Sequence, residues 1–265
     1  MDDVLTKSSE RIPLDPALFA ERSARDDRFV VEDRWVDCEN YPADHPLREI
    51  EFIHRQMNEE VDGLECSARC LSDFPEADWG LRLWLARQCS DEARHGRMYR
   101  RILERRGGHV GQFPVLSFQY RIINAVSTLV GRLTIQNRSF EAGGLDAIAA
   151  GIVDAQANGD EELAELFDAQ LADEILHVRF ANDYIRRTIE TDRRAVLDMG
   201  AALVKASKAF TEVMASEATD GATYPADRQS RREAGFTDAE VDQAEALAAA
   251  KIAQPTTKAS GRDPS

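Results

Sequence analysis

Apolar side chains recur along this 265-residue chain at alternating steps of three and four residues, the period of helices that bury one face. No stretch shows the two-residue alternation typical of strands, so we predict an all-α fold. The pattern and its Pro and Gly breaks predict helices over residues 46–72, 76–106, 116–143, 146–157, 160–190, 192–215 and 237–252.

Composition changes at both ends of the helical pattern. The first residues are rich in Pro, Asp and Arg, with one short helix expected near 16–25. Beyond the bundle, Thr237 and Glu240 form a capping box that begins the helix at 237–252, and a disordered tail is expected after it. We therefore predict an N-terminal arm over 1–45, a helical bundle over 46–215 and a C-terminal extension over 216–265.

Four of the predicted helices carry acidic or imidazole side chains in the middle of their apolar stripes. In helix 160–190, for example, Glu174 and His177 lie between Phe167 and Ala181 at the same helical spacing. An unpaired carboxylate in a helical core is costly, so several of them together require cations. The six residues of this kind are Glu60, Glu92, His95, Glu141, Glu174 and His177, and the stripes also contain the amides Gln88, Asn137 and Gln170.

These six residues form two triads of the same plan, each a lone Glu followed about thirty residues later by Glu-x-x-His. Four carboxylates and two imidazoles in this order are the ligands of a di-iron or di-manganese site inside a four-helix bundle. Two divalent ions would balance the four carboxylates, which favours two ions over one. Oxygen and nitrogen ligands without thiolate favour iron or manganese over structural zinc.

The net charge, the hydropathy and the cysteine spacing limit what the protein is expected to bind and where it is expected to be located. The formal net charge of −15 argues against nucleic acid as a partner. No apolar run approaches the roughly 20 residues of a membrane span, and the first residues do not resemble a secretory signal. The four cysteines lack metal-ligand spacing and suit buried free thiols. We therefore expect a cytoplasmic protein without a membrane partner, and the sequence leaves open a homodimer.

Other acidic and histidine residues near the triads are not expected to bind metal. Glu51 and His54 form a third Glu-x-x-His string, but it lies at the start of its helix and lacks a second carboxylate at the repeat distance. We expect it at the surface or at a pocket rim. Glu59 and Glu65 lie near Glu60 but off the apolar stripe, so Glu60 is the expected ligand of that helix.

A glycine follows each lone glutamate by three residues. Gly63 and Gly144 would each leave room for a cluster or for a close helix contact. The alternative is an ordinary packing or capping role, and for Gly144 the two interpretations are equally open.

With these motifs in view, residues 46–190 resemble the ferritin-like di-iron carboxylate superfamily. The string from Asp91 to His95 is similar to the motif of bacterial multicomponent monooxygenases. The run from Asp73 to Pro75 that leads into it looks closer to a ferritin-like family of unassigned function. The resemblance implies an antiparallel four-helix bundle in which Glu92 and Glu174 bridge two metal ions and Glu60 and Glu141 are terminal ligands.

The resemblance also suggests roles for residues beside the ligands. Asp91 would orient His177, and Asp173 would orient His95, because a metal-bound imidazole needs a partner for its other ring N–H. Taken alone, each Asp could equally be a solvated neighbour of the adjacent Glu. Tyr99 is similar in placement to the radical tyrosine of the ribonucleotide reductase small subunit and is a candidate catalytic residue. A core tyrosine with a hydrogen-bond partner is the simpler interpretation.

Our leading hypothesis is therefore an O2-dependent di-iron oxidoreductase that acts on a small organic substrate, with Glu92 and Glu174 at its catalytic centre. The cofactor would be two iron ions, or a manganese and iron pair, with O2 as co-substrate and an unknown electron donor. Two alternatives remain. One is a ferroxidase or metal-handling protein without organic substrate, and the other is a non-catalytic helical interaction protein.

Overall fold

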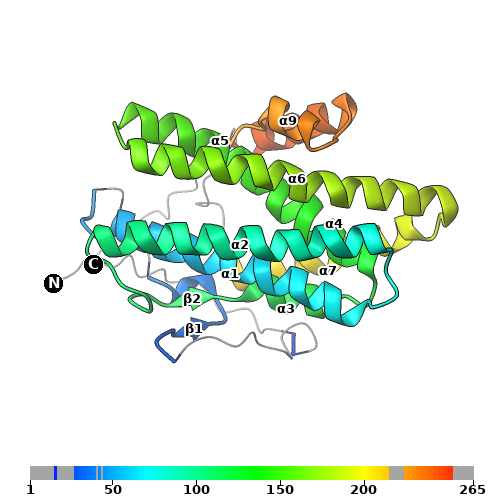
Figure 1. Ribbon diagram of the computed structural model, residues 1–265, viewed down its shortest axis with the longest axis horizontal. Coiled ribbons are helices and arrows are strands. Elements are labelled where there is room, and N and C mark those ends of the chain that lie inside the picture. The colour runs from blue at the N-terminus through cyan, green and yellow to red at the C-terminus, as the bar shows by residue number, and fades with distance from the viewer. Residues whose placement is uncertain (1–14, 17–26, 40, 43, 215–223, 253–265) are drawn as a thin grey trace, which may run out of the picture.

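The structure is a computed structural model that describes residues 15–16, 27–39, 41–42, 44–214 and 224–252 (Figure 1). Nearly all of the short helix expected near 16–25, and the tail expected after 252, lie outside these residues. The described part of the chain is mostly helical, which confirms the predicted all-α class. Its helices are α1 (Arg48–Asp73), α2 (Trp79–Arg105), α3 (Phe118–Asn124), α4 (Leu129–Ile135), α5 (Ala142–Ala157), α6 (Glu161–Thr191), α7 (Ala195–Met214), α8 (Arg228–Glu233) and α9 (Asp238–Ile252).

Two helix pairs form the body of the molecule (Figure 1). α1 packs along α2, α5 packs along α6, and α2 and α6 also contact each other. α4 packs against α7. The centre of the molecule is therefore enclosed by α1, α2, α6 and the helical stretch that leads from α4 into α5.

Side-chain caps fix where the long helices begin. Asp78 accepts hydrogen bonds from the backbone N–H groups of Gly80 at 2.6 Å and Leu81 at 3.3 Å, and Asp160 caps α6 in the same way. The predicted capping box before α9 is confirmed. The Thr237 N–H donates to Glu240 Oε2 at 2.8 Å, and the Glu240 N–H donates to Thr237 Oγ1 at 3.4 Å.

The helix predicted over 116–143 is the main correction to the sequence-based fold. It is broken after α3, and Thr128 caps a new start by accepting from the Gly131 N–H at 3.2 Å. From Leu129 the chain stays helical to Ala157, through the π-helix η2 (Gln136–Glu141). The predicted stop at Gly143 and Gly144 is wrong, because burial of the flanking residues outweighs the roughly 1 kcal/mol cost of a helical glycine.

The structure also contains short elements that the periodicity did not reveal. β1 (Val31–Glu32) and β2 (Val115–Leu116) pair in parallel, and the single-turn helix η1 (Trp35–Asp37) follows β1. The sequence pattern gave no signal for these two strands. Segments of two residues are too short to show alternation. This pairing fastens the described part of the N-terminal arm to the loop before α3.

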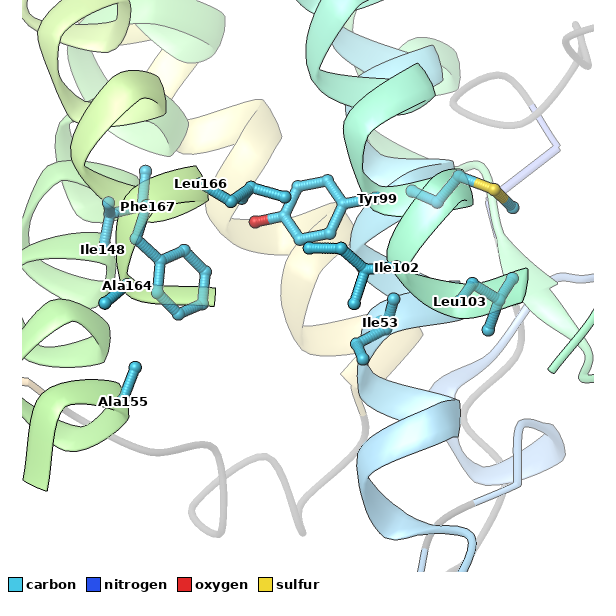
Figure 2. Close-up of a cluster of buried hydrophobic side chains, with 10 residues drawn as sticks. Ile53, Tyr99, Ile102, Leu103, Ile148, Ala155, Ala164, Leu166 and Phe167 are labelled. Atoms are coloured by element: carbon cyan, nitrogen blue, oxygen red, sulfur yellow. The ribbon is translucent and has the colours of Figure 1, made fainter. Parts of the chain in front are cut away.

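Side chains of both helix pairs meet in the core. Figure 2 shows one cluster, in which Ile53, Tyr99 and Ile102 of the first pair face Ile148 and Phe167 of the second. On α2 the apolar stripe that carries Glu92 and His95 is buried along its whole length, namely at Leu81, Leu85, Gln88, Glu92, His95, Tyr99 and Ile102. On α1 the spacing from Glu60 and Leu64 would place Ala68 on the inward stripe, but Ala68 is exposed, and Cys66 and Cys70 are buried instead.

Candidate metal centre

The six residues predicted as ligands come together between the helix pairs. They form two overlapping groups, each offering four ligand atoms that lie within 4.8 Å of one another. Glu92 and Glu174 belong to both groups, which is the arrangement expected of bridging carboxylates. The first group is Glu60, Glu92, His95 and Glu174, and the second is Glu92, Glu141, Glu174 and His177.

The Glu-x-x-His spacing places both side chains of each pair on one helix face. On α2 the Nδ1 atom of His95 lies 3.1 Å from Glu60 Oε2 and 3.5 Å from Glu92 Oε2. On α6 the Nδ1 atom of His177 lies 3.2 Å from Glu174 Oε2. The Nδ1 atom of each imidazole is therefore the ring nitrogen that faces the clustered glutamates.

The Nε2 atom of each imidazole faces an aspartate on the other helix. His177 Nε2 lies 3.3 Å from Asp91 Oδ2, and His95 Nε2 lies 3.2 Å from Asp173 Oδ2. These are the pairings predicted from the sequence. An imidazole that donates its Nε2 proton to a carboxylate presents Nδ1 as a lone pair, as a metal ligand must.

Two arginines hold the aspartates in turn. Arg87 and Arg94 are partly exposed on α2, and each contacts both Asp91 and Asp173. Each imidazole is thus connected to the surface through a carboxylate and a guanidinium group.

Burial governs the protonation of the carboxyl groups in the cluster. It raises the pKa of Glu60 well above its ordinary value and that of Glu141 to about 8. Burial also disfavours charge on Glu92, but the hydrogen bond with His95 and the neighbouring imidazoles outweigh it and lower the pKa of Glu92. Protons on Glu60 and Glu141 thus relieve the repulsion between buried carboxylates, and bound cations would replace them.

The two imidazoles respond to the same carboxylates. Burial alone would lower the pKa of His95, but hydrogen bonds with Glu60 and Glu92 outweigh it and raise the pKa to about 11. The pKa of His177 is also well above its ordinary value, because the charge of Glu174 and the hydrogen bond with Asp91 exceed the effect of burial. The space between the carboxylates therefore strongly attracts positive charge, from a proton or from a metal ion.

The backbone also leaves room for the cluster. A Cβ atom on Gly63 would come within 2.9 Å of Glu92 Oε1, closer than such contacts normally occur. The predicted spacing role of Gly63 is therefore confirmed. Gly144 has nothing within 4 Å of its Cβ position and lies inside α5, so it serves neither as a spacer nor as a cap.

The predicted neighbour Tyr99 reaches the cluster through an amide. The ring is fully buried, and its hydroxyl points from α2 toward α6 (Figure 2). The hydroxyl donates to Gln170 Oε1 at 2.8 Å, and Gln170 Nε2 donates to Glu60 Oε1 at 2.8 Å. Tyr99 is thus a core tyrosine with a hydrogen-bond partner, and Gln170 links it to the candidate ligand Glu60.

Three further amides surround Glu141, and their role there was not predicted from the sequence. Gln88 and Gln136 donate to Glu141 Oε1, and Asn137 donates to Oε2 at 2.8 Å. One signal could have revealed part of this set. Gln88 and Gln170 each precede a shared glutamate by four residues, so the repeat extends one turn beyond the triads.

The third Glu-x-x-His string stays outside the cluster but is not at the surface. His54 is fully buried and Glu51 is 3% exposed, so the predicted surface or rim position is wrong. His54 Nε2 accepts the backbone N–H of Gly111 at 2.9 Å, while Glu51 pairs with Arg55 at 2.9 Å. The described loop and arm residues cover this end of α1, which helical periodicity could not reveal.

Among the described residues, one surface groove is separate from the cluster. It has a volume of about 470 Å³ and lies along α2 and α6. None of the six clustered residues lines it. Its walls are formed by Leu81, Trp84, Leu176, Arg179, Phe180, Asp183, Arg186 and Arg187.

Fold and site together define a helical protein with a buried cluster of glutamates and histidines that could hold metal. The chain belongs to the family described as "Protein of unknown function (DUF455)", whose model matches residues 8–242. Comparison with curated proteins and with solved structures found no match. None of the described helices is both long and apolar enough to cross a membrane.

Proposed function

We propose that this protein is an O2-dependent oxidoreductase of the ferritin-like class, with two iron ions, or manganese and iron, held by the six clustered residues. Its substrate would be a small organic molecule. The observation that carries the proposal is the pair of overlapping ligand groups that share Glu92 and Glu174. Two such groups of buried carboxylates and imidazoles fit two hard divalent cations better than one.

The donor set fits iron or manganese in detail. Each position offers carboxylate oxygens and a single imidazole nitrogen, with no thiolate among the grouped residues. Asp91 and Asp173 keep Nδ1 of each imidazole available by accepting the Nε2 proton. The glycine at position 63 leaves the space that Glu92 occupies.

Two bound iron ions would supply the electrons that reduce dioxygen. The chain's own residues would hold the ions and exclude bulk water. Glu60, Glu92 and Glu174 are all at most 6% exposed, so the reacting centre would be screened from solvent. Tyr99 and Gln170 would fix the orientation of Glu60.

Metal content and oxygen uptake test the proposal. Protein from iron-replete cells should contain about two iron or manganese ions per chain, and the reduced protein should consume O2 with an oxidised organic product when the right substrate is present. Oxygen uptake that follows added ferrous ion alone, without any organic product, would favour the ferroxidase alternative. Stoichiometric zinc, or no metal, would refute the metal centre.

A further inference from the structure

We propose that the two metal positions are inequivalent and fill in order, with the Glu141–His177 position binding first and more tightly than the Glu60–His95 position. The inference rests on the metal centre of the proposed function. It follows from the amide side chains around the two lone glutamates: each glutamate accepts from one glutamine of the opposite half, and only Glu141 accepts from two further amides.

The contact that both glutamates share in kind comes from a pair of glutamines. Gln88 on α2 donates from Nε2 to Glu141 Oε1, and Gln170 on α6 donates from Nε2 to Glu60 Oε1. Each helix of the α2–α6 pair thus orients the lone glutamate of the opposite half. With these two contacts alone, Glu60 and Glu141 would be held equally.

The two further contacts, which occur only at Glu141, come from residues of the π-helix. Gln136 and Asn137 precede Glu141 by five and four residues, and the wider turn of a π-helix places both offsets on the face of Glu141. Gln136 Nε2 donates to Glu141 Oε1 at 3.1 Å, and Asn137 Nδ2 donates to Oε2 at 2.8 Å. Asn137 is itself held by a 3.0 Å hydrogen bond to Gln88 Oε1.

The same offsets before Glu60 give no such support. Its helix, α1, is α-helical there, and the residues five and four positions earlier are Arg55 and Gln56. Both turn to Glu59 instead: Gln56 Nε2 donates at 3.0 Å, and Arg55 lies at 3.4 Å while also pairing with Glu51. A single amide, from Gln170, therefore holds the Glu60 carboxylate.

This difference changes how many lone-pair directions each carboxylate has left for a metal ion. A carboxylate offers about four lone-pair directions. The three amides at Glu141 take two directions on Oε1 and one on Oε2, which leaves Oε2 for a single bond to metal. At Glu60 only Oε1 is engaged by an amide, so Oε2 is open once the ion separates it from His95 Nδ1. Glu60 can therefore ligate through one oxygen or both.

A ligand that is already fixed loses less conformational freedom when the ion binds. The Glu141–His177 position should therefore bind first, and the Glu60–His95 position second, with a carboxylate that adjusts to its ion. Gln136 and Asn137 are positioning residues in this scheme, because they act on the metal only through Glu141.

Titration of metal-free protein with cobalt(II) tests the order, followed by visible absorption and by calorimetry. Two separate binding events are expected. Gln136→Met, which keeps the side-chain volume but removes the amide, should weaken the tight event about 10-fold or more and leave the weak event unchanged. The matched variant Gln170→Met should weaken the weak event only, and thermal melts would show that both variants remain folded.

Two further variants assign the events without relying on the amides. His177→Ala should remove the tight event, and His95→Ala should remove the weak one. Two equal events in the parent protein, or loss of the tight event in His95→Ala, would overturn the order while leaving the proposed function intact. No cobalt binding at all would overturn the metal centre and this inference with it.

Discussion

His54 and His95 are both fully buried, and each follows a glutamate by three residues on a helix. Their chemistry is nevertheless opposite. Burial lowers the pKa of His54 to about 4, whereas hydrogen bonds with Glu60 and Glu92 outweigh burial and raise the pKa of His95 to about 11. His54 lies among the rings of Phe29 and Phe113 and accepts a backbone N–H. A Glu-x-x-His string therefore has no chemistry of its own until other helices supply carboxylates.

The largest expected effect separates the shared glutamates from the glutamate of the third string. Glu92→Ala or Glu174→Ala should remove both metal ions, because each residue belongs to both ligand groups. Glu51→Ala is the matched control and should retain both ions, since Glu51 pairs with Arg55 instead. Elemental analysis of the purified variants measures this. Retention of one ion by Glu92→Ala would show that Glu92 does not bridge.

A smaller effect is expected where the imidazoles meet their aspartates. Asp173→Ala should weaken metal binding about 10- to 100-fold, and Asp91→Ala by a similar factor, because each frees the Nε2 proton of one imidazole from its acceptor. Competition with a chelator gives the affinity, and circular dichroism checks the fold. Parent-like affinity in both variants would favour the alternative that these aspartates are only neighbours of the cluster.

The cluster could be predicted from the sequence because the Glu-x-x-His spacing and the apolar stripe place the same residues in the core. Glu92 and His95 lie in the middle of an apolar stripe that is buried along its whole length. His54 was misplaced because what buries it, Phe29 and the loop at Gly111, comes from irregular segments without periodicity. Gln136 was missed for a related reason: it reaches Glu141 only through π-helical geometry, and a residue five positions away faces elsewhere on an α-helix.

The contrast between the histidines also predicts a pH dependence of stability. The folded-state pKa of His54, about 4, lies below its ordinary value of 6.5, so between these values the unfolded chain binds more protons. The free energy of unfolding should therefore fall as the pH is lowered from 6.5 to 4, by up to about 3 kcal/mol from this group. A second proton would also displace the Gly111 N–H from Nε2.

Urea unfolding of the metal-free parent and of His54→Gln, compared across this pH range, isolates the contribution. Glutamine can accept the same N–H but does not titrate, so the variant should lose less stability in acid. The metal-binding residues titrate in both proteins and cancel in the difference. Parallel stability curves would show that His54 does not take up a proton on unfolding.

The smallest expected effects distinguish the two glycines that follow the lone glutamates. Gly63→Ala would place a methyl group 2.9 Å from Glu92 Oε1, so the carboxylate must shift within its ligand group. We expect this to weaken metal binding by about 1 kcal/mol, or roughly fivefold. Gly144→Ala meets no atom within 4 Å inside a helix and should raise the free energy of unfolding by roughly 0.5–1 kcal/mol without changing metal affinity. Chelator competition and urea unfolding of both variants give the two quantities. Equal metal affinities would mean that Glu92 has room to move, and that the space at Gly63 serves helix packing rather than the metal centre.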